Sequence, residues 1–145
     1  MGAHSMVRAL YRAYDGPLYM VHRRSDSSNL TIGVLTAGGL QNSTAQDVFC
    51  KGTECTVLVI FDQSPEGNHL TANHKGRHFP VDHGVNASRH PIMLSGRRVY
   101  GAWFDEGMGY SNRANTTGIA KGADPESMYA VFGGHHYDNI CCFGK

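Results

Sequence analysis

The apolar residues of this chain occur in short runs that are separated by glycines and polar turn residues. The most informative run is Thr56–Phe61, which reads T-V-L-V-I-F and is rich in β-branched residues. A continuously apolar run of this length is typical of a strand that is covered on both faces. With 18 glycines among 145 residues, many further runs are equally short. The sequence therefore favours short strands and frequent turns over long helices.

Five other segments have the composition or the alternation of strands. The residues Ser95-Gly96-Arg97 join two of these segments and predict a hairpin. The five predicted strands are Leu18–Arg24, Ile32–Leu35, Pro91–Leu94, Arg98–Phe104 and Met128–Phe132.

Two short segments carry the signals of a helix start. Ser5 can cap a helix over Met6–Tyr14. Gln46 stands three residues after Ser43, which is the spacing of a capping box and predicts a second helix that ends at Phe49.

The remaining long stretches, His69–His90 and Glu106–Asp124, have little periodicity and are predicted to be loops. A chain of 145 residues can bury one substantial core. No internal repeat, low-complexity tract or linker divides it. We therefore predict one domain, an all-β sandwich with one or two short helices.

Charge and hydropathy argue against two classes of partner. The chain has 13 basic and 12 acidic residues, whereas nucleic-acid-binding domains usually carry a basic excess. No apolar run approaches the ~18 residues of a membrane span, so neither nucleic acid nor membrane is an expected partner. The opening residues Met1–Met6 lack the apolar stretch of a secretory signal. N-x-[ST] sequons, which alone are weak indicators of secretion, lie at Asn29, Asn42, Asn86 and Asn115.

The four cysteines form two local pairs. Cys50 and Cys55 bracket a four-residue loop, a comfortable span for a disulfide. Cys141 and Cys142 are adjacent, and consecutive Cα atoms lie about 3.8 Å apart, below the usual range of roughly 4.4–6.8 Å for a disulfide. Bridging them requires a distorted backbone of the kind found at functional sites; the alternative is two reduced thiols. Neither pair has the spacing of a zinc site, and no metal site is predicted.

Seven of the histidines gather in two places, a long loop and the region before the last cysteines. No spacing among them indicates convergent metal ligands, so we predict solvated surface side chains. These residues are His69, His74, His78, His83, His90, His135 and His136.

A series of motifs runs in order along almost the whole chain. They are Ala3-His4-Ser5, Gly16-Pro17-Leu18-Tyr19, Ala45-Gln46-Asp47-Val48-Phe49-Cys50, Gly52-Thr53-Glu54-Cys55, Phe61-Asp62-Gln63-Ser64, Gly67-Asn68-His69-Leu70-Thr71 and Cys141-Cys142-Phe143. Taken together, they resemble the catalytic domain of α-L-arabinofuranosidase B, glycoside hydrolase family 54.

The resemblance implies a concanavalin-like or laminin-G-like β-sandwich, of which residues 1–145 would be the N-terminal part without a second domain. It implies retaining hydrolysis of terminal non-reducing α-L-arabinofuranosyl residues of arabinan and arabinoxylan. The expected partner is then arabinose-containing plant cell-wall polysaccharide, the expected location is extracellular, and no cofactor is expected. It also implies two disulfides: Cys50–Cys55 would be structural, and Cys141–Cys142 would form an apolar platform against the sugar.

The resemblance supplies no catalytic residue in this chain, because the family's nucleophile and acid/base carboxylates correspond to positions beyond Lys145. Of the acids present, Asp62 is expected to bond its own turn, and Asp105 and Glu106 are expected to be solvated. We therefore expect residues 1–145 alone to have no arabinofuranosidase activity. The alternative is a non-catalytic carbohydrate-binding or remnant β-sandwich module; a cytosolic structural protein with reduced cysteines is a third reading.

Overall fold

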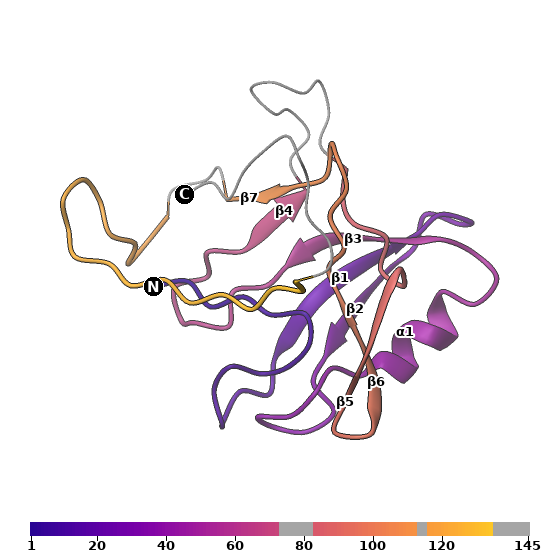
Figure 1. Ribbon diagram of the computed structural model, residues 1–145. Helices are drawn as coiled ribbons and strands as arrows, with labels where there is room; N and C mark the ends of the chain where they lie inside the picture. Colours follow the sequence, from indigo (N-terminus) through magenta and orange to yellow (C-terminus); the bar gives the residue numbers. More distant parts are fainter. Residues whose placement is uncertain (73–82, 113–115, 135–145) are drawn as a thin grey trace.

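The computed structural model describes residues 1–72, 83–112 and 116–134. These residues form β1 (Pro17–Arg23), β2 (Asn29–Gly33), α1 (Ser43–Phe49), β3 (Cys55–Ile60), β4 (Leu70–Ala72), β5 (His90–Leu94), β6 (Arg97–Gly101) and β7 (Tyr110–Ser111). One sheet has five strands in the order β2-β1-β3-β4-β7, and the hairpin β5-β6 forms a second sheet (Figure 1). The all-β prediction is confirmed, with one short helix in the described residues. That the sheets belong to a sandwich stays a prediction.

The core lies on one face of the five-stranded sheet. Val21 on β1 lies opposite Leu30 on β2 and Val57 on β3, in antiparallel register. Val21, Ile32 and Val57 are all 0 % exposed, so alternate residues of neighbouring strands form one apolar layer. Other side chains of β3 are only half-buried. The prediction that Thr56–Phe61 is covered on both faces therefore holds for one face only.

The N-cap of helix α1 lies one residue earlier than the sequence predicts. Asn42, not Ser43, is the N-cap, and its side-chain oxygen accepts the N–H of Ala45 at 3.2 Å. The predicted capping-box partner, Gln46, turns inward instead and is 0 % exposed. The helix is correctly predicted, but the role of Gln46 is wrong.

The β5–β6 hairpin is confirmed with different boundaries. Its turn consists of Ser95 and Gly96 alone, which have φ of +50° and +73°. Two consecutive positive φ values are those of a type I′ turn, whose twist matches that of the flanking strands. Arg97 belongs to β6, and that strand ends at Gly101 rather than at Phe104.

The predicted helix over Met6–Tyr14 is wrong. Ser5 does accept the N–H groups of Val7 and Arg8, as a cap would. The chain then pairs with a neighbouring segment, since Ala9 donates to Gly39 and Gln41 donates to Val7. Long-range backbone pairing thus takes the hydrogen bonds that a helix would have made internally.

The predicted strand Met128–Phe132 is also wrong, since no strand forms there. Met128 is 80 % exposed and Tyr129 is 87 % exposed. In Figure 1 this part of the chain is the yellow stretch beside the N-terminus, and it is drawn without a strand arrow. A strand needs a neighbour to accept its backbone hydrogen bonds, and none of the strands in the described ranges supplies one.

The predicted surface loop His69–His90 contains a strand and buried residues in its described parts. Leu70–Ala72 forms β4, and Val85 and Ala87 are 0 % exposed. Val57 donates to the carbonyl of Val85, which fixes this segment beside β3. The predicted loop Glu106–Asp124 likewise contains the two-residue strand β7. No helix in the described ranges has the length and apolarity to cross a membrane.

Candidate functional site

Asp62 lies two residues after the end of β3 and is 4 % exposed. Its carboxylate accepts the N–H groups of Ala3, Ser64 and Asn68 at 2.8, 2.9 and 2.9 Å and the hydroxyl of Ser64 at 2.8 Å. Burial opposes its ionisation, but these hydrogen bonds outweigh burial and hold the pKa of Asp62 below its ordinary value. The expected turn-bonding role is confirmed, and the group is suited to fixing backbone rather than to donating a proton.

The residues that follow Asp62 also bond to segments that are distant in sequence. Together, residues Asp62–Asn68 form what we call the Asp62 clasp. Gln63 accepts the N–H of Leu10 at 2.7 Å and donates to the carbonyl of Arg8 at 3.1 Å. Asn68 makes a reciprocal pair with Thr117, accepting its N–H at 3.0 Å and donating to its carbonyl at 2.8 Å. The Asp62–Asn68 motif therefore holds the N-terminal segment and residues near 117 against the end of β3.

Asp105 is not simply solvated, contrary to expectation. One carboxylate oxygen lies 2.6 Å from a guanidinium nitrogen of Arg89, and the other accepts the indole N–H of Trp103 at 3.0 Å. The guanidinium also lies over the indole, 5.5 Å from the ring centroid. Glu106 is exposed, as expected. Asp105 therefore anchors the chain after β6 instead of standing free in solvent.

A further acidic group, Asp47 on α1, was not singled out from the sequence. It accepts the hydroxyl of Tyr100 at 2.6 Å and a guanidinium N–H of Arg98 at 2.5 Å. Burial, together with Asp47, raises the pKa of Tyr100 to about 12. The group lies beside a hollow of about 350 Å³ whose lining includes Ser43 and Arg97. Its partners on β6 are more than fifty residues away in the sequence, so no local spacing points to this group.

None of these acids has the surroundings that retaining glycoside hydrolysis needs. That chemistry uses two carboxyl groups about 5–5.5 Å apart, one ionised and one held protonated. Asp47 and Asp105 are each paired with a cation, and Asp62 is surrounded by N–H and O–H donors. The donors around Asp62 stabilise its ionised form. The expectation that the family's catalytic carboxylates lie outside this chain stays a prediction.

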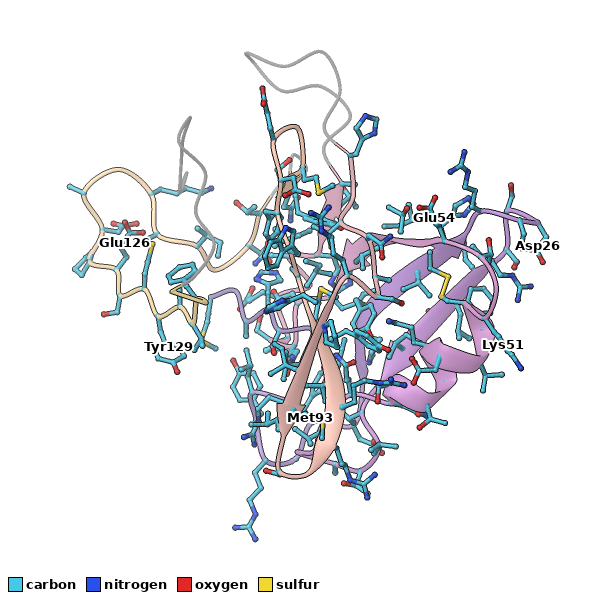
Figure 2. All side chains as sticks on the ribbon, turned by 45° about the vertical axis from the view of Figure 1, so that its right-hand side comes forward. Asp26, Lys51, Glu54, Met93, Glu126 and Tyr129 are labelled. Atoms are coloured by element: carbon cyan, nitrogen blue, oxygen red, sulfur yellow. A yellow bond between two sulfur atoms is a disulfide. The ribbon has the colours of Figure 1, made fainter. Side chains whose placement is uncertain are left out.

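Of the two predicted disulfides, the structure describes one. Cys50 and Cys55 are bridged, with a Cα–Cα distance of 5.8 Å. Figure 2 shows the bond in yellow between the labelled side chains of Lys51 and Glu54. It links the end of α1 to the start of β3, which fixes the helix beside the sheet. Cys141 and Cys142, the predicted sugar platform, lie outside the described residues.

The histidines that the structure describes are not grouped as metal ligands. His69 accepts the N–H of Asp62 at 3.0 Å and packs edge-on against Phe61. His90 packs against Trp103. In the described ranges, no three histidine, cysteine or acidic side chains could jointly hold a metal ion. His74, His78, His135 and His136 lie outside those ranges.

Comparison with known proteins shows the family to which the chain belongs. A family model described as "Alpha-L-arabinofuranosidase B, catalytic" matches residues 1–144. The chain belongs to the α-L-arabinofuranosidase B catalytic family. A probable α-L-arabinofuranosidase B of Aspergillus fumigatus is 47 % identical over 99 % of this chain and 29 % of its own length. The α-L-arabinofuranosidase B of Aspergillus niger is 45 % identical over 99 % of this chain and 30 % of its own length.

Solved structures of family members have the same fold. A family-54 α-L-arabinofuranosidase soaked with a cyclic sulfate inhibitor superposes with a TM-score of 0.79 at 41 % identity, over 83 % of this chain and 26 % of that one. An arabinofuranosidase complexed with arabinofuranosyl-α-1,2-xylobiose gives a TM-score of 0.78, also at 41 % identity. The chain thus spans less than a third of the length of the family members it matches. The clasp around Asp62 and the Cys50–Cys55 bridge belong to the scaffold of an arabinofuranosidase B catalytic domain.

Proposed function

We propose that this chain is the N-terminal part of the catalytic domain of a secreted α-L-arabinofuranosidase. The reaction is retaining hydrolysis of terminal non-reducing α-L-arabinofuranosyl residues of arabinan and arabinoxylan. The observation that carries the proposal is the superposition on family-54 arabinofuranosidases at a TM-score of 0.79 and 41 % identity. The relative in complex with arabinofuranosyl-α-1,2-xylobiose supports the substrate class.

Within that domain, the described residues serve as scaffold. The Asp62 clasp, the buried side chain of Gln46 and the Cys50–Cys55 bridge fix the end of β3, helix α1 and the N-terminal segment relative to one another. A sugar site needs such rigidity, because catalytic groups must be held within a fraction of an ångström. The adjacent pair Cys141–Cys142 provides the chain's own contact with substrate, two polarizable sulfurs against the apolar face of a furanose.

A chimeric enzyme tests this assignment. In the α-L-arabinofuranosidase B of Aspergillus niger, the segment that matches this chain is replaced by residues 1–144, and hydrolysis of an aryl α-L-arabinofuranoside is measured. We expect kcat/KM within about tenfold of the parent, which corresponds to about 1.4 kcal/mol of transition-state stabilisation. A chimera that folds, by circular dichroism and gel filtration, but shows no turnover would overturn the proposal.

The same chimera tests the sulfur platform. Replacing Cys141 and Cys142 together by serine should raise KM, because a hydroxyl pair offers a smaller and more polar surface to the sugar. The matched control replaces Cys50 and Cys55 by serine, which should lower thermal stability with little effect on KM. If the chimera is inactive while this chain alone binds arabinoxylan in a pull-down, the non-catalytic module is the correct reading.

A further inference from the structure

Three of the four sequons lie in described residues, and their surroundings differ sharply. A sequon can carry an N-linked glycan in the folded protein only where the asparagine amide reaches solvent, since the glycan is bulky and hydrophilic. The fourth sequon, at Asn115, lies outside the described residues.

The sequon at Asn86 lies against the core. Its neighbours Val85 and Ala87 are both 0 % exposed, and Asn86 itself is half-buried. The side-chain oxygen of Asn86 accepts the N–H of Ser88 at 3.0 Å, and the hydroxyl of Ser88 lies 3.4 Å from the amide nitrogen of Gln46. Asn86 therefore bonds within its own turn on a half-buried segment between two fully buried residues, although Ser88 itself is exposed.

The sequon at Asn42 belongs to the start of helix α1. Asn42 is half-buried, and its side-chain oxygen caps Ala45. Ser43 donates to the carbonyl of Arg98 on the neighbouring hairpin. A glycan on Asn42 would have to reach solvent past the residues that pack against the start of the helix, while Asn42 still caps it.

The sequon at Asn29 is the open one. Asn29 and Thr31 are both exposed, and they share one face of β2, while Ile32 on the opposite face is fully buried. Oδ1 of Asn29 lies 2.8 Å from Nδ1 of His22 across the β1–β2 pair, which orients the amide and leaves its nitrogen outside this contact. In Figure 2, the turn that carries the labelled Asp26 leads into this strand at the outer end of the sheet.

The place of Asn29 in the sheet gives such a glycan a physical role. Strand β2 is the first strand in the order β2-β1-β3-β4-β7, so one side of it pairs with no other strand of that sheet in the described residues. Unpaired strand edges invite pairing with other chains, and proteins protect them with charge, bulges or covering groups. A hydrated glycan on the exposed face of this strand would hinder such an approach.

We propose that Asn29 is an N-glycosylation site and that the outer face of β2 stays open to solvent in the complete protein. The proposal rests on secretion, which belongs to the proposed function, but it is independent of catalytic activity. The structure assigns the modification to Asn29 over Asn42 and Asn86 on exposure and on the contacts of each amide.

In the test, the full chain is expressed in yeast with a cleavable leader that directs it into the secretory pathway. The secreted protein is treated with a peptide N-glycosidase, an amidase that removes the glycan and converts the glycosylated asparagine to aspartate, and peptide mass mapping locates the conversion. We expect conversion at Asn29, and we expect Asn29→Gln to lose the mass of one glycan while Asn42→Gln and Asn86→Gln lose none. An unconverted Asn29 in secreted protein would overturn the proposal.

A matched pair of variants separates modification from folding. Thr31→Ala destroys the sequon but leaves Asn29 and its contact with His22 in place, whereas Thr31→Ser keeps the sequon. The glycan should be absent from the first variant and present on the second, at comparable secreted yield. Equal modification of both would contradict the assignment. Neither readout uses arabinofuranosidase activity, so an error in the proposed reaction would leave this result unchanged.

Discussion

At the scale of single residues, the buried side-chain amide of Gln46 connects three parts of the core. The side chain of Gln46 accepts the hydroxyl of Tyr19 at 2.7 Å and donates to the carbonyl of Ala87 at 2.9 Å. It joins helix, sheet and the segment after 83 inside the core. Sequence spacing predicts the helix but assigns Gln46 to a cap, since its true partners lie 27 and 41 residues away.

Replacing Gln46 by alanine should therefore be strongly destabilising. The substitution strands two buried polar groups, and each costs about 1–3 kcal/mol, so we expect unfolding to become easier by at least about 2 kcal/mol. Urea unfolding followed by circular dichroism measures this. Val48→Ala is the control on the same helix, because Val48 is 73 % exposed and should change stability by less than about 0.5 kcal/mol. Equal effects of the two variants would refute the role of Gln46.

Asp62 predicts how stability depends on pH. Its pKa is lowered in the folded protein, because the hydrogen bonds to its carboxylate outweigh the opposing effect of burial. Such a group stabilises the fold fully above its unfolded pKa of about 4, and that stability is lost as pH falls through the folded pKa. The free energy of unfolding should thus decrease below about pH 5. Asp62→Asn should be less stable at neutral pH and show a shallower acid-side decrease; a parallel decrease in both proteins would contradict this.

At the scale of elements, local turn chemistry is predicted well and pairing is predicted poorly. The hairpin β5–β6 follows from its turn residues, since Gly96 accepts a positive φ without cost. Met6–Tyr14 and Met128–Phe132 fail for one shared reason: whether a segment becomes helix, strand or extended loop depends on neighbours that are distant in sequence. Met6–Tyr14 finds such a neighbour near Gly39, whereas Met128–Phe132 has no strand beside it in the described residues.

The turn of this hairpin offers a sharp test of the structure. Ser95 has φ of +50°, a region that asparagine tolerates better than serine. Ser95→Asn should raise Tm slightly, by a stability gain of a few tenths of a kcal/mol. Gly96→Ala should lower it by about 1 kcal/mol of stability, since an alanine at φ of +73° is strained. Thermal unfolding of both variants checks the signs, and a reversed order would show that the turn is not type I′.

At the scale of the whole molecule, the sequence and the structure give different information about the site. The order of the motifs identifies the family without a structure, because together they match its catalytic domain along almost the whole chain. The structure then explains what those motifs do: the Asp62 segment fixes backbone, and Cys50–Cys55 joins α1 to β3. Neither supplies a pair of carboxyl groups poised for hydrolysis. We therefore predict that these residues provide scaffold and do not supply the acid–base chemistry.

The most direct test of that prediction is the rate at which the isolated 145-residue chain hydrolyses an aryl α-L-arabinofuranoside. Cleavage needs a proton for the leaving oxygen and a second carboxylate for the oxocarbenium-like centre, so we expect no turnover above the buffer rate. Turnover on the order of 1–10³ per second, in the range of ordinary enzymes, would contradict it. Loss of that turnover in Asp62→Asn, Asp105→Asn or Glu106→Gln would then show which local acid performs the chemistry.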